Sequence, residues 1–319
     1  MTDPWHLRLV EVASPLLERC AFPDRSSSSP SSGYPCAVSG GADSTALLLL
    51  AFVAGCNPIA HHVDHRLRDT SAEEAGCVEA LAKRLGRPFV RHEVAVAPGP
   101  NLEARARAAR MAVLPAGVAT GHTADDQCET VLINLMRGAA TDGLSAMRPG
   151  RAHPLLKLRR AETRELCALA GLEPVEDPTN LDPAHLRNRV RHELIPMMCA
   201  LARRDVVPIV ARQAQLLGDD AEYLDALAGV LDPLDSRGLS TAPAPLARRA
   251  VRGWLRTDHP PSAATVERVL SVARGSAVAS EVGSGRQVRR SKGRLALLEA
   301  ADGADPGDLG PSRASRSPG

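Results

Sequence analysis

The feature that most constrains this chain is an alternation of short apolar runs and helix-like segments between residues 34 and 136. Four apolar runs are expected to form strands, at 35–38, 58–63, 88–96 and 117–120. Four segments expected to be helical follow them, at 45–53, 71–85, 101–114 and 125–136. Such a strand–helix repeat predicts an α/β domain with a parallel sheet and right-handed crossovers.

Polar segments follow three of the expected strands. They lie at 39–44, at 64–65 and at 121–129. Parallel sheets of this type bind ligands outside the carboxyl ends of their strands. The sequence therefore predicts a functional site at that edge of the sheet.

The remaining segments suggest two domains and two tails. We expect a helix and Ser-rich linker at 1–33, the α/β domain at 34–200, a connecting helix at 201–231, a smaller, mainly helical domain at 232–300 and a disordered tail at 301–319. The helical pattern runs from 162 to 228, with a polar interruption at 177–180. In the second domain the pattern predicts helices at 245–256 and 262–272 and strands at 281–290 and 294–298.

Composition excludes several classes of protein. The seven cysteines form no CxxC pair, which argues against a disulfide framework, a zinc ribbon and a thioredoxin-type motif. Aromatic residues are only 2%, too few for an aromatic platform that stacks bases. The longest apolar run, 46–55, is shorter than the ~20 residues that span a bilayer, and the N-terminus does not look like a signal peptide. We therefore expect a cytoplasmic protein that contacts no membrane.

The segment 39–44, SGGADS, is a candidate anion-binding loop between a strand and a helix. Its glycines allow a tight turn whose N–H groups approach an anion, at the positive end of the following helix. It lacks the GxxxxGK[ST] and GxGxxG patterns. The simpler alternative is an ordinary Gly-rich turn with a polar helix cap.

The segment 121–130, GHTADDQCET, is the second candidate. His122, Asp126 and Glu129 are three or four residues apart, so they can share one helix face. A carboxylate pair with a histidine suits Mg²⁺ binding or proton transfer. The alternative is helix capping, since Asp125 and Asp126 in a first turn complement the helix dipole.

Two further segments carry weaker signals. Asp64 and His65 follow the second expected strand, where they suit a nucleotide or a polarised base, although a polar loop explains them equally well. Arginines and a lysine cluster in three places, at Arg105, Arg107 and Arg110, at Arg151, Lys157, Arg159 and Arg160, and at Arg187, Arg189 and Arg191. These clusters are either solvated helix faces or contacts to RNA phosphates or ATP.

The motifs together resemble the tRNA(Ile)-lysidine synthase family of the PP-loop, or N-type, ATP pyrophosphatase superfamily. The matching segments run in order at 39–44, 62–68, 106–110, 121–139, 153–160 and 176–196, with less specific matches at 245–256 and 288–298. The resemblance implies a doubly wound parallel sheet of the adenine nucleotide alpha hydrolase-like type. Arg66 stands where the family usually has Gly, and Met111 where it has Tyr, so we expect altered affinity without loss of activity.

The resemblance implies a ligase that uses ATP, Mg²⁺, free L-lysine and the isoleucine tRNA with a CAU anticodon. The O2 atom of the first anticodon cytidine attacks the α-phosphate of ATP, and pyrophosphate leaves. The ε-amine of lysine then attacks C2 and expels AMP, which gives lysidine.

The resemblance also implies roles for individual residues. Phosphates are held by Ser39, Gly40, Gly41, Ala42, Asp43 and Ser44, with Asp64 and His65 near the nucleotide. Asp43 and Asp126 bracket Mg²⁺, while Asp125 and Glu129 hold the lysine ammonium group or accept its proton. His122 and Arg110 stabilise charge on the α-phosphate or the base. RNA is positioned by Arg187, Arg189 and Arg191.

Two alternatives remain at this stage. A PP-loop enzyme that thiolates tRNA would share the adenylation step, but such enzymes use cysteines, often as CxxC, and Cys128 has no near partner in sequence. A non-catalytic tRNA-binding module would not need both motifs intact. Both a monomer and a homodimer are compatible with the sequence.

Overall fold

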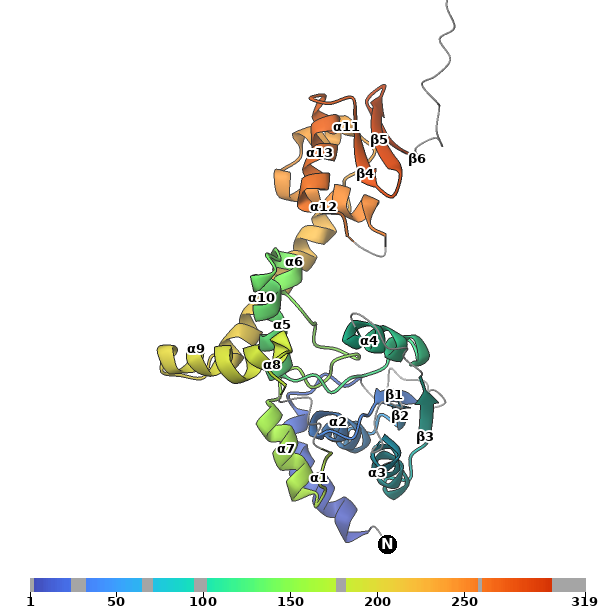
Figure 1. Cartoon of the computed structure of the whole chain (residues 1–319), viewed down its shortest axis with the longest axis vertical. Coiled ribbons are helices and arrows are strands. Elements are labelled where there is room, and N and C mark those ends of the chain that lie inside the picture. Colours follow the sequence, from blue (N-terminus) through green and yellow to red (C-terminus); the bar gives the residue numbers. More distant parts are fainter. Residues whose placement is uncertain are drawn as a thin grey trace, which may run out of the picture. The chain divides into compact units, whose positions relative to one another are not determined.

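The computed structural model describes residues 3–23, 33–64, 71–94, 102–175, 182–257 and 260–299 (Figure 1). The chain divides into two compact units, 1–219 and 220–319. Within the described residues, no helix is both long and apolar enough to cross a membrane. The expected interruption at 177–180, the disordered tail at 301–319, and the residues His65 and Arg66 lie outside the described residues.

The first unit contains a three-stranded parallel sheet in the order β1 (Tyr34–Ala37), β2 (Pro58–Asp64), β3 (Phe89–Glu93). Cys36 pairs with Ala60, and Ala60 pairs with Phe89. The helices α2 (Ala42–Val53), α3 (Ser71–Arg84) and α4 (Leu102–Val113) follow the three strands in turn. The expected α/β class is confirmed.

The expected fourth strand at 117–120 is wrong in length. Its only pairing with the sheet in the described chain is a one-residue parallel bridge between Ala119 and Cys36. The N–H of Val118 is turned back to Pro115, and the N–H of Thr120 donates to Ala152 instead of to a strand. Neither of these flanking N–H groups therefore donates to a neighbouring strand.

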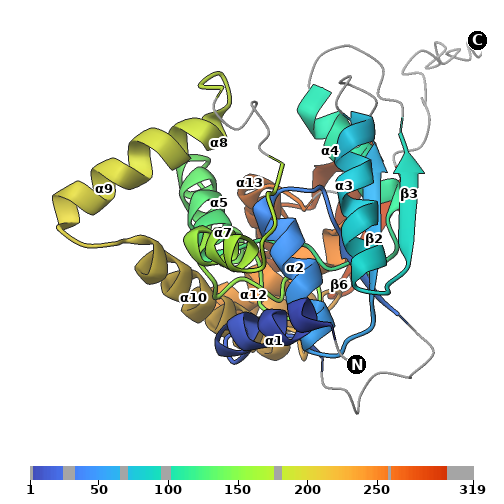
Figure 2. The ribbon, with the colours of Figure 1, turned by 90° about the horizontal axis from the view of Figure 1, so that it is seen from below.

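Helix α2 forms the centre of the core of this unit. Its residues Ala46 to Ala51 are fully buried, as its unbroken apolar run leads one to expect. The helices α1 (Pro4–Leu17) and α7 (Arg160–Leu169) pack against it, through Leu9 and Leu166 among others (Figure 2). This packing brings the first turn of α7 to the first turn of α2.

The rest of this unit is helical. It comprises α5 (Ala124–Met136), α6 (Thr141–Leu144), α8 (Leu186–Arg189), the π-helical turn η2 (Val190–Leu194), α9 (Ile195–Ala202) and α10 (Val207–Ala228), which crosses the boundary between the units. Helix α5 packs against α8 and η2. Single π-helical turns are frequent at functional sites, and this one carries Arg191.

The second unit combines α11 (Ser236–Thr241), α12 (Ala244–Leu255) and α13 (Ala263–Arg274) with an antiparallel sheet of β4 (Ala279–Gly283), β5 (Arg286–Ser291) and β6 (Arg294–Glu299). Val251, Leu270 and Val288 are fully buried in its core. The single strand expected at 281–290 is wrong: the chain folds back at Gly283, Ser284 and Gly285, whose positive φ angles form a hairpin turn.

Candidate active site

The loop between β1 and α2 holds the SGGADS segment. Helix α2 begins at Ala42, three residues earlier than expected, so Asp43 and Ser44 lie in its first turn. The N-cap is Gly41. Because glycine has no side chain, the first backbone N–H groups of the helix receive no side-chain cap. Gly40 has a φ of +94°, a left-handed conformation that favours glycine. The uncapped first-turn N–H groups and the positive end of the helix suit an anion.

The loop is held in shape by its own serines. The N–H of Ser39 donates to Ser44 Oγ at 3.1 Å, and Ser44 Oγ donates to the carbonyl of Gly41 at 2.9 Å. Val175 closes the other side, because its N–H donates to the carbonyl of Gly40 at 3.0 Å. The turn is therefore held by hydrogen bonds within the protein.

Gly121 joins the two candidate motifs. A Cβ atom at this position would stand 2.5 Å from the carbonyl oxygen of Asp43 and 2.9 Å from the backbone nitrogen of Ser44. Only glycine allows so close an approach of one backbone to another. The GHTADDQCET segment therefore starts against the first turn of α2.

Three carboxylates gather around one guanidinium group, that of Arg160. Its Nη2 donates to Asp126 Oδ1 at 2.8 Å, its Nη1 to Glu129 Oε1 at 3.2 Å, and its Nε to Asp43 Oδ2 at 3.3 Å. Glu129 is fully buried and Asp126 nearly so. Thr163, also on α7, donates its hydroxyl proton to Asp43 Oδ1. The structure thus brings Asp43, Asp126 and Glu129 together.

Two of the three arginines expected to contact RNA instead face these carboxylates. Arg187 Nε donates to Glu129 Oε2 at 2.7 Å and its Nη2 to Asp126 Oδ1 at 3.2 Å. Arg191 donates two hydrogen bonds to Glu129, from Nε to Oε1 at 2.7 Å and from Nη2 to Oε2 at 3.1 Å. Arg189 points elsewhere: it is exposed and pairs with Glu193 at 3.4 Å.

Asp125 is not part of this cluster of carboxylates. Arg159 binds it with two bonds of 3.0 Å, from Nε to Oδ2 and from Nη2 to Oδ1, and the backbone N–H of Arg160 adds a third at 2.9 Å. Arg159 also pairs with Asp205. The neighbouring aspartates therefore hold successive arginines, and Asp125 orients the start of α7.

The environment moves the pKa values of the aspartates in opposite directions. Burial raises the pKa of Asp43, and the contacts from Thr163 and Arg160 do not cancel that effect. Burial also acts on Asp126, but Arg160 and the N–H of Thr123 outweigh it and the pKa falls. For Asp125, the bonds from Arg159 and Arg160 likewise outweigh burial and lower the pKa. Shifted carboxylates of this kind gather at functional sites.

Of the other predicted residues that the structure describes, His122 is close enough to Asp126 to lower its pKa, whereas Arg110 and Asp64 are not shown to contact this cluster. His122 Nδ1 lies 2.7 Å from Thr120 Oγ1, which is also 2.8 Å from His153 Nδ1. Arg110 is half-buried in the last turn of α4. Asp64 is buried at the end of β2, where it accepts a bond of 2.6 Å from Arg91 Nη2 and so ties β2 to β3.

Two family models match the chain, a PP-loop domain over residues 21–198 and a TilS substrate binding domain over 234–296. A tRNA(Ile)-lysidine synthase from Thermobifida fusca is 40% identical over 75% of this chain and 81% of the relative. The chain belongs to the tRNA(Ile)-lysidine synthase family. Synthases of the same name from Nocardia farcinica (43% identical, 69% of this chain, 74% of the relative) and Salinispora tropica (37%, 82% and 90%) agree with this assignment.

In this lysidine synthase family member, sequence reasoning missed several residues that the structure places in the site. Arg160 and Thr163 both contact Asp43 from more than a hundred residues away in the chain. The arginine pair at 159–160 was noticed as basic, but only the fold shows that it faces carboxylates. Thr163 could not be predicted from the sequence, because a single threonine in a helix is common and belongs to no motif.

The acidic cluster has the right donors for Mg²⁺, which prefers carboxylate oxygens. Asp43 and Asp126 both contact the Arg160 guanidinium, through its Nε and Nη2. Among the described side chains, no group of three or more His, Cys, Asp or Glu is arranged to hold a metal ion. Proteins commonly bind Mg²⁺ through one or two carboxylates and the phosphates of a nucleotide, and these two aspartates fit that mode.

Proposed function

We propose that this chain joins lysine to C2 of the first anticodon cytidine of tRNA(Ile) with a CAU anticodon, with ATP cleaved to AMP and pyrophosphate. The reaction passes through an adenylylated cytidine. ATP, Mg²⁺ and free L-lysine are the small-molecule partners. As a tRNA-modifying enzyme, the protein is expected to act in the cytoplasm.

The contact between Gly121 and the backbone of Asp43 carries this proposal. It puts an uncapped helix start, which suits phosphates, beside a buried carboxylate cluster, which suits cations. An enzyme that adenylylates a base and then presents an amine needs both in one place. Phosphate groups would be held by Ser39, Gly40, Gly41, Ala42, Asp43 and Ser44.

The cluster around Glu129 supports a binding site for the lysine ammonium group. Asp126 and Glu129 share the guanidinium groups of Arg160 and Arg187, so their oxygens already face cations. A primary ammonium group is another cation with several donors. We assign the lysine ε-amine to Glu129, and Asp125 to positioning Arg159.

Asp43 and Asp126 are the residues that would hold Mg²⁺ beside the phosphates. When bound, the metal supplies positive charge to the departing pyrophosphate. Arg160 contacts both carboxylates. Its guanidinium would stabilise charge on the α-phosphate, together with His122 and Arg110.

Thiolation of tRNA is the weaker reading of the same site. Cys128 is the cysteine within the second motif, but it is fully buried, and burial raises its pKa to about 12. A thiol with so high a pKa is a poor nucleophile, because the thiolate is the reactive form. None of the seven cysteines forms a disulfide bond.

The deciding experiment follows labelled lysine into unmodified tRNA(Ile) with a CAU anticodon, in the presence of ATP and Mg²⁺. A tRNA with uridine at the first anticodon position is the control. Incorporation that requires both ATP and the cytidine is the expected result. Pyrophosphate release without lysine incorporation would leave adenylation standing and return thiolation to consideration. If neither occurs with folded protein, the chain is a tRNA-binding module without activity.

A further inference from the structure

A cavity lies across helix α5 from the carboxylate cluster. Ala124 and Gln127 line it, whereas Asp126 and Glu129 point into the cluster. At 3.6 residues per turn these two pairs occupy opposite faces of the helix. The cavity and the carboxylate cluster are therefore separated by the width of one helix, about 10–12 Å.

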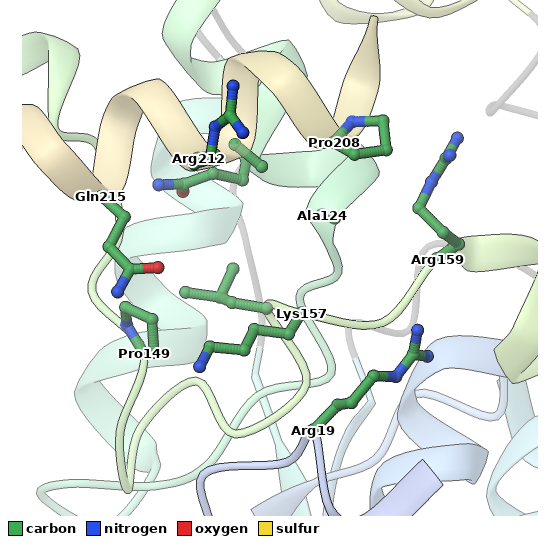
Figure 3. A pocket seen from close by; sticks show the side chains of 11 residues that line it. Arg19, Ala124, Pro149, Lys157, Arg159, Pro208, Arg212 and Gln215 are labelled. Carbon is green, nitrogen blue, oxygen red and sulfur yellow. The ribbon is translucent and has the colours of Figure 1, made fainter. Parts of the chain in front are cut away.

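Basic side chains from three separate segments surround this cavity, and Figure 3 shows them. Arg19 follows α1, Lys157 and Arg159 precede α7, and Arg212 lies on α10. Arg19 is paired with Glu162, and Arg159 is paired with Asp125 and Asp205. Lys157 and Arg212 are exposed, and neither has an ion-pair partner within the part of the chain that the structure describes.

The charge at the cavity is therefore not balanced by the protein. Lys157 and Arg212 together place a charge of +2 at this cavity, whereas the formal net charge of the whole chain is only +2. Unpaired cations that line one cavity attract an anion, and a phosphate accepts from both lysine and arginine donors. The rest of the wall is formed by the apolar residues Ala124, Pro149, Leu156, Pro208 and Ala211 and by the amides Gln127 and Gln215.

The size of the cavity limits its occupant. Its volume is about 250 Å³, below the ~300–1,000 Å³ typical of sites that enclose a whole small-molecule ligand. ATP is too large for it. A phosphate with part of its ribose or base is a suitable occupant, since the phosphate meets the basic rim and the sugar or base meets the prolines and Leu156.

We propose that this cavity binds one backbone phosphate of the RNA substrate, with Lys157 and Arg212 as the phosphate contacts. The inference rests on the proposed function for the identity of the RNA. The carboxylate cluster, where the modified nucleotide would react, lies one helix width from the cavity. A neighbouring nucleotide of the same RNA can therefore reach the cavity past the start of α5. The cavity then fixes the register of the RNA without reading its sequence.

The test measures binding of unmodified tRNA(Ile) by full-length protein at several salt concentrations. The variants are Lys157→Gln, Arg212→Gln and the double variant, with Arg8→Gln as the matched control. Arg8 is exposed on α1 and does not line the cavity. Because the substituted side chains are exposed and unpaired, all variants are expected to unfold at the wild-type denaturant concentration.

Each single variant is expected to weaken tRNA binding about three- to tenfold, the value of one partly exposed charge-assisted contact. The double variant is expected to reduce the slope of log K against log salt by about one, because one phosphate contact is lost. Arg8→Gln is expected to change neither quantity. A double variant with the affinity and slope of Arg8→Gln overturns the proposal.

A second arm titrates the protein with inorganic pyrophosphate in the absence of RNA, followed by thermal shift. A shift that the double variant loses, with tRNA binding unchanged, means that the cavity holds free phosphates, and it overturns the RNA assignment. The proposed function fails separately: the wild type would not incorporate lysine, while the double variant would still bind tRNA more weakly. If lysine is incorporated but the double variant binds tRNA normally, only the cavity proposal fails.

Discussion

Gly121 and Asp43 lie backbone against backbone, so that a methyl group on Gly121 would stand 2.5 Å from the Asp43 carbonyl oxygen. This contact joins the end of the short segment beside β1 to the first turn of α2. Neither partner can move aside easily, because α2 is fully buried at its centre. The distance between the phosphate loop and the carboxylate cluster is thus set by the absence of one side chain.

Gly121→Ala is expected to lower the free energy of unfolding by about 1–3 kcal/mol, the usual cost of overpacking. It is also expected to lower ATP-dependent pyrophosphate release, because the two motifs are pushed apart. Urea denaturation and a pyrophosphate assay measure the two effects.

Gly76→Ala is the matched control for this prediction. Gly76 lies within α3, and a Cβ atom there would meet nothing within 4 Å. Because alanine is the better helix former, this variant is expected to be more stable by about 0.5–1 kcal/mol. If Gly121→Ala behaves like Gly76→Ala, the close approach of the two motifs is not needed.

Glu129→Gln is expected to be severely destabilising. Glu129 is fully buried and accepts bonds from Arg160, Arg187 and Arg191, so removing its charge leaves guanidinium groups without compensation. Losing one partner of a buried ion pair costs about 3–5 kcal/mol. Chemical denaturation at neutral pH measures this loss.

Glu193→Gln serves as its control, because Glu193 is exposed and pairs only with Arg189 among the described residues. Exposed ion pairs contribute about 0–1 kcal/mol. Equal effects of the two substitutions would mean that the guanidinium groups around Glu129 are compensated by other groups.

The elements of the fold follow from local pattern wherever packing agrees with it. Helix α2 was predictable from its apolar run, and β2 ends within one residue of the expected position. The strand at 117–120 was predicted too long, because only Ala119 pairs with β1 and an apolar run does not show where pairing stops. The hairpin at 283–285 was missed because its turn residues were read as part of one long strand.

The candidate site was predictable only where its residues are neighbours in sequence. The motif containing Asp126 and Glu129 stands out because helical spacing puts both on one face. Arg160 reaches the same carboxylates from a different helix, and the bond to Asp43 spans 117 residues. No local spacing encodes such a contact, so the roles of the arginines as carboxylate partners required the structure.

The pH dependence of stability is expected to reflect two opposed aspartates. The folded-state pKa of Asp126 is lowered, so its contribution to stability is present above its unfolded pKa and is lost as pH falls through the folded value. The pKa of Asp43 is raised, so its contribution is present below the unfolded value and is lost as pH rises through the folded value. Unfolded aspartates titrate near pH ~3.9, so the folded pKa of Asp126 lies below this pH and that of Asp43 lies above it.

Substitution of each aspartate separates these effects. Asp126→Asn is expected to flatten the fall in unfolding free energy between neutral pH and about pH 3, because the group that loses stability on protonation is gone. Asp43→Asn is expected to make that fall steeper, because the opposing group is gone. Urea midpoints measured across this range give both slopes, and parallel curves for wild type and both variants would contradict the opposed shifts.

Arg189 and Arg191 are two residues apart but are expected to differ in what they affect. Arg191 is held by Glu129 at 2.7 and 3.1 Å, so Arg191→Gln weakens a buried cluster and is expected to cost about 1–3 kcal/mol of stability. Arg189 is exposed, so Arg189→Gln is expected to keep the wild-type stability within about 0.5 kcal/mol. If Arg189 contacts an RNA phosphate, as the basic segment predicts, its loss weakens tRNA binding about threefold and reduces the salt slope by about one. Denaturation and tRNA titration on the same two proteins test the contrast. An Arg189→Gln protein with wild-type affinity and salt slope would show that this segment serves the carboxylate cluster alone.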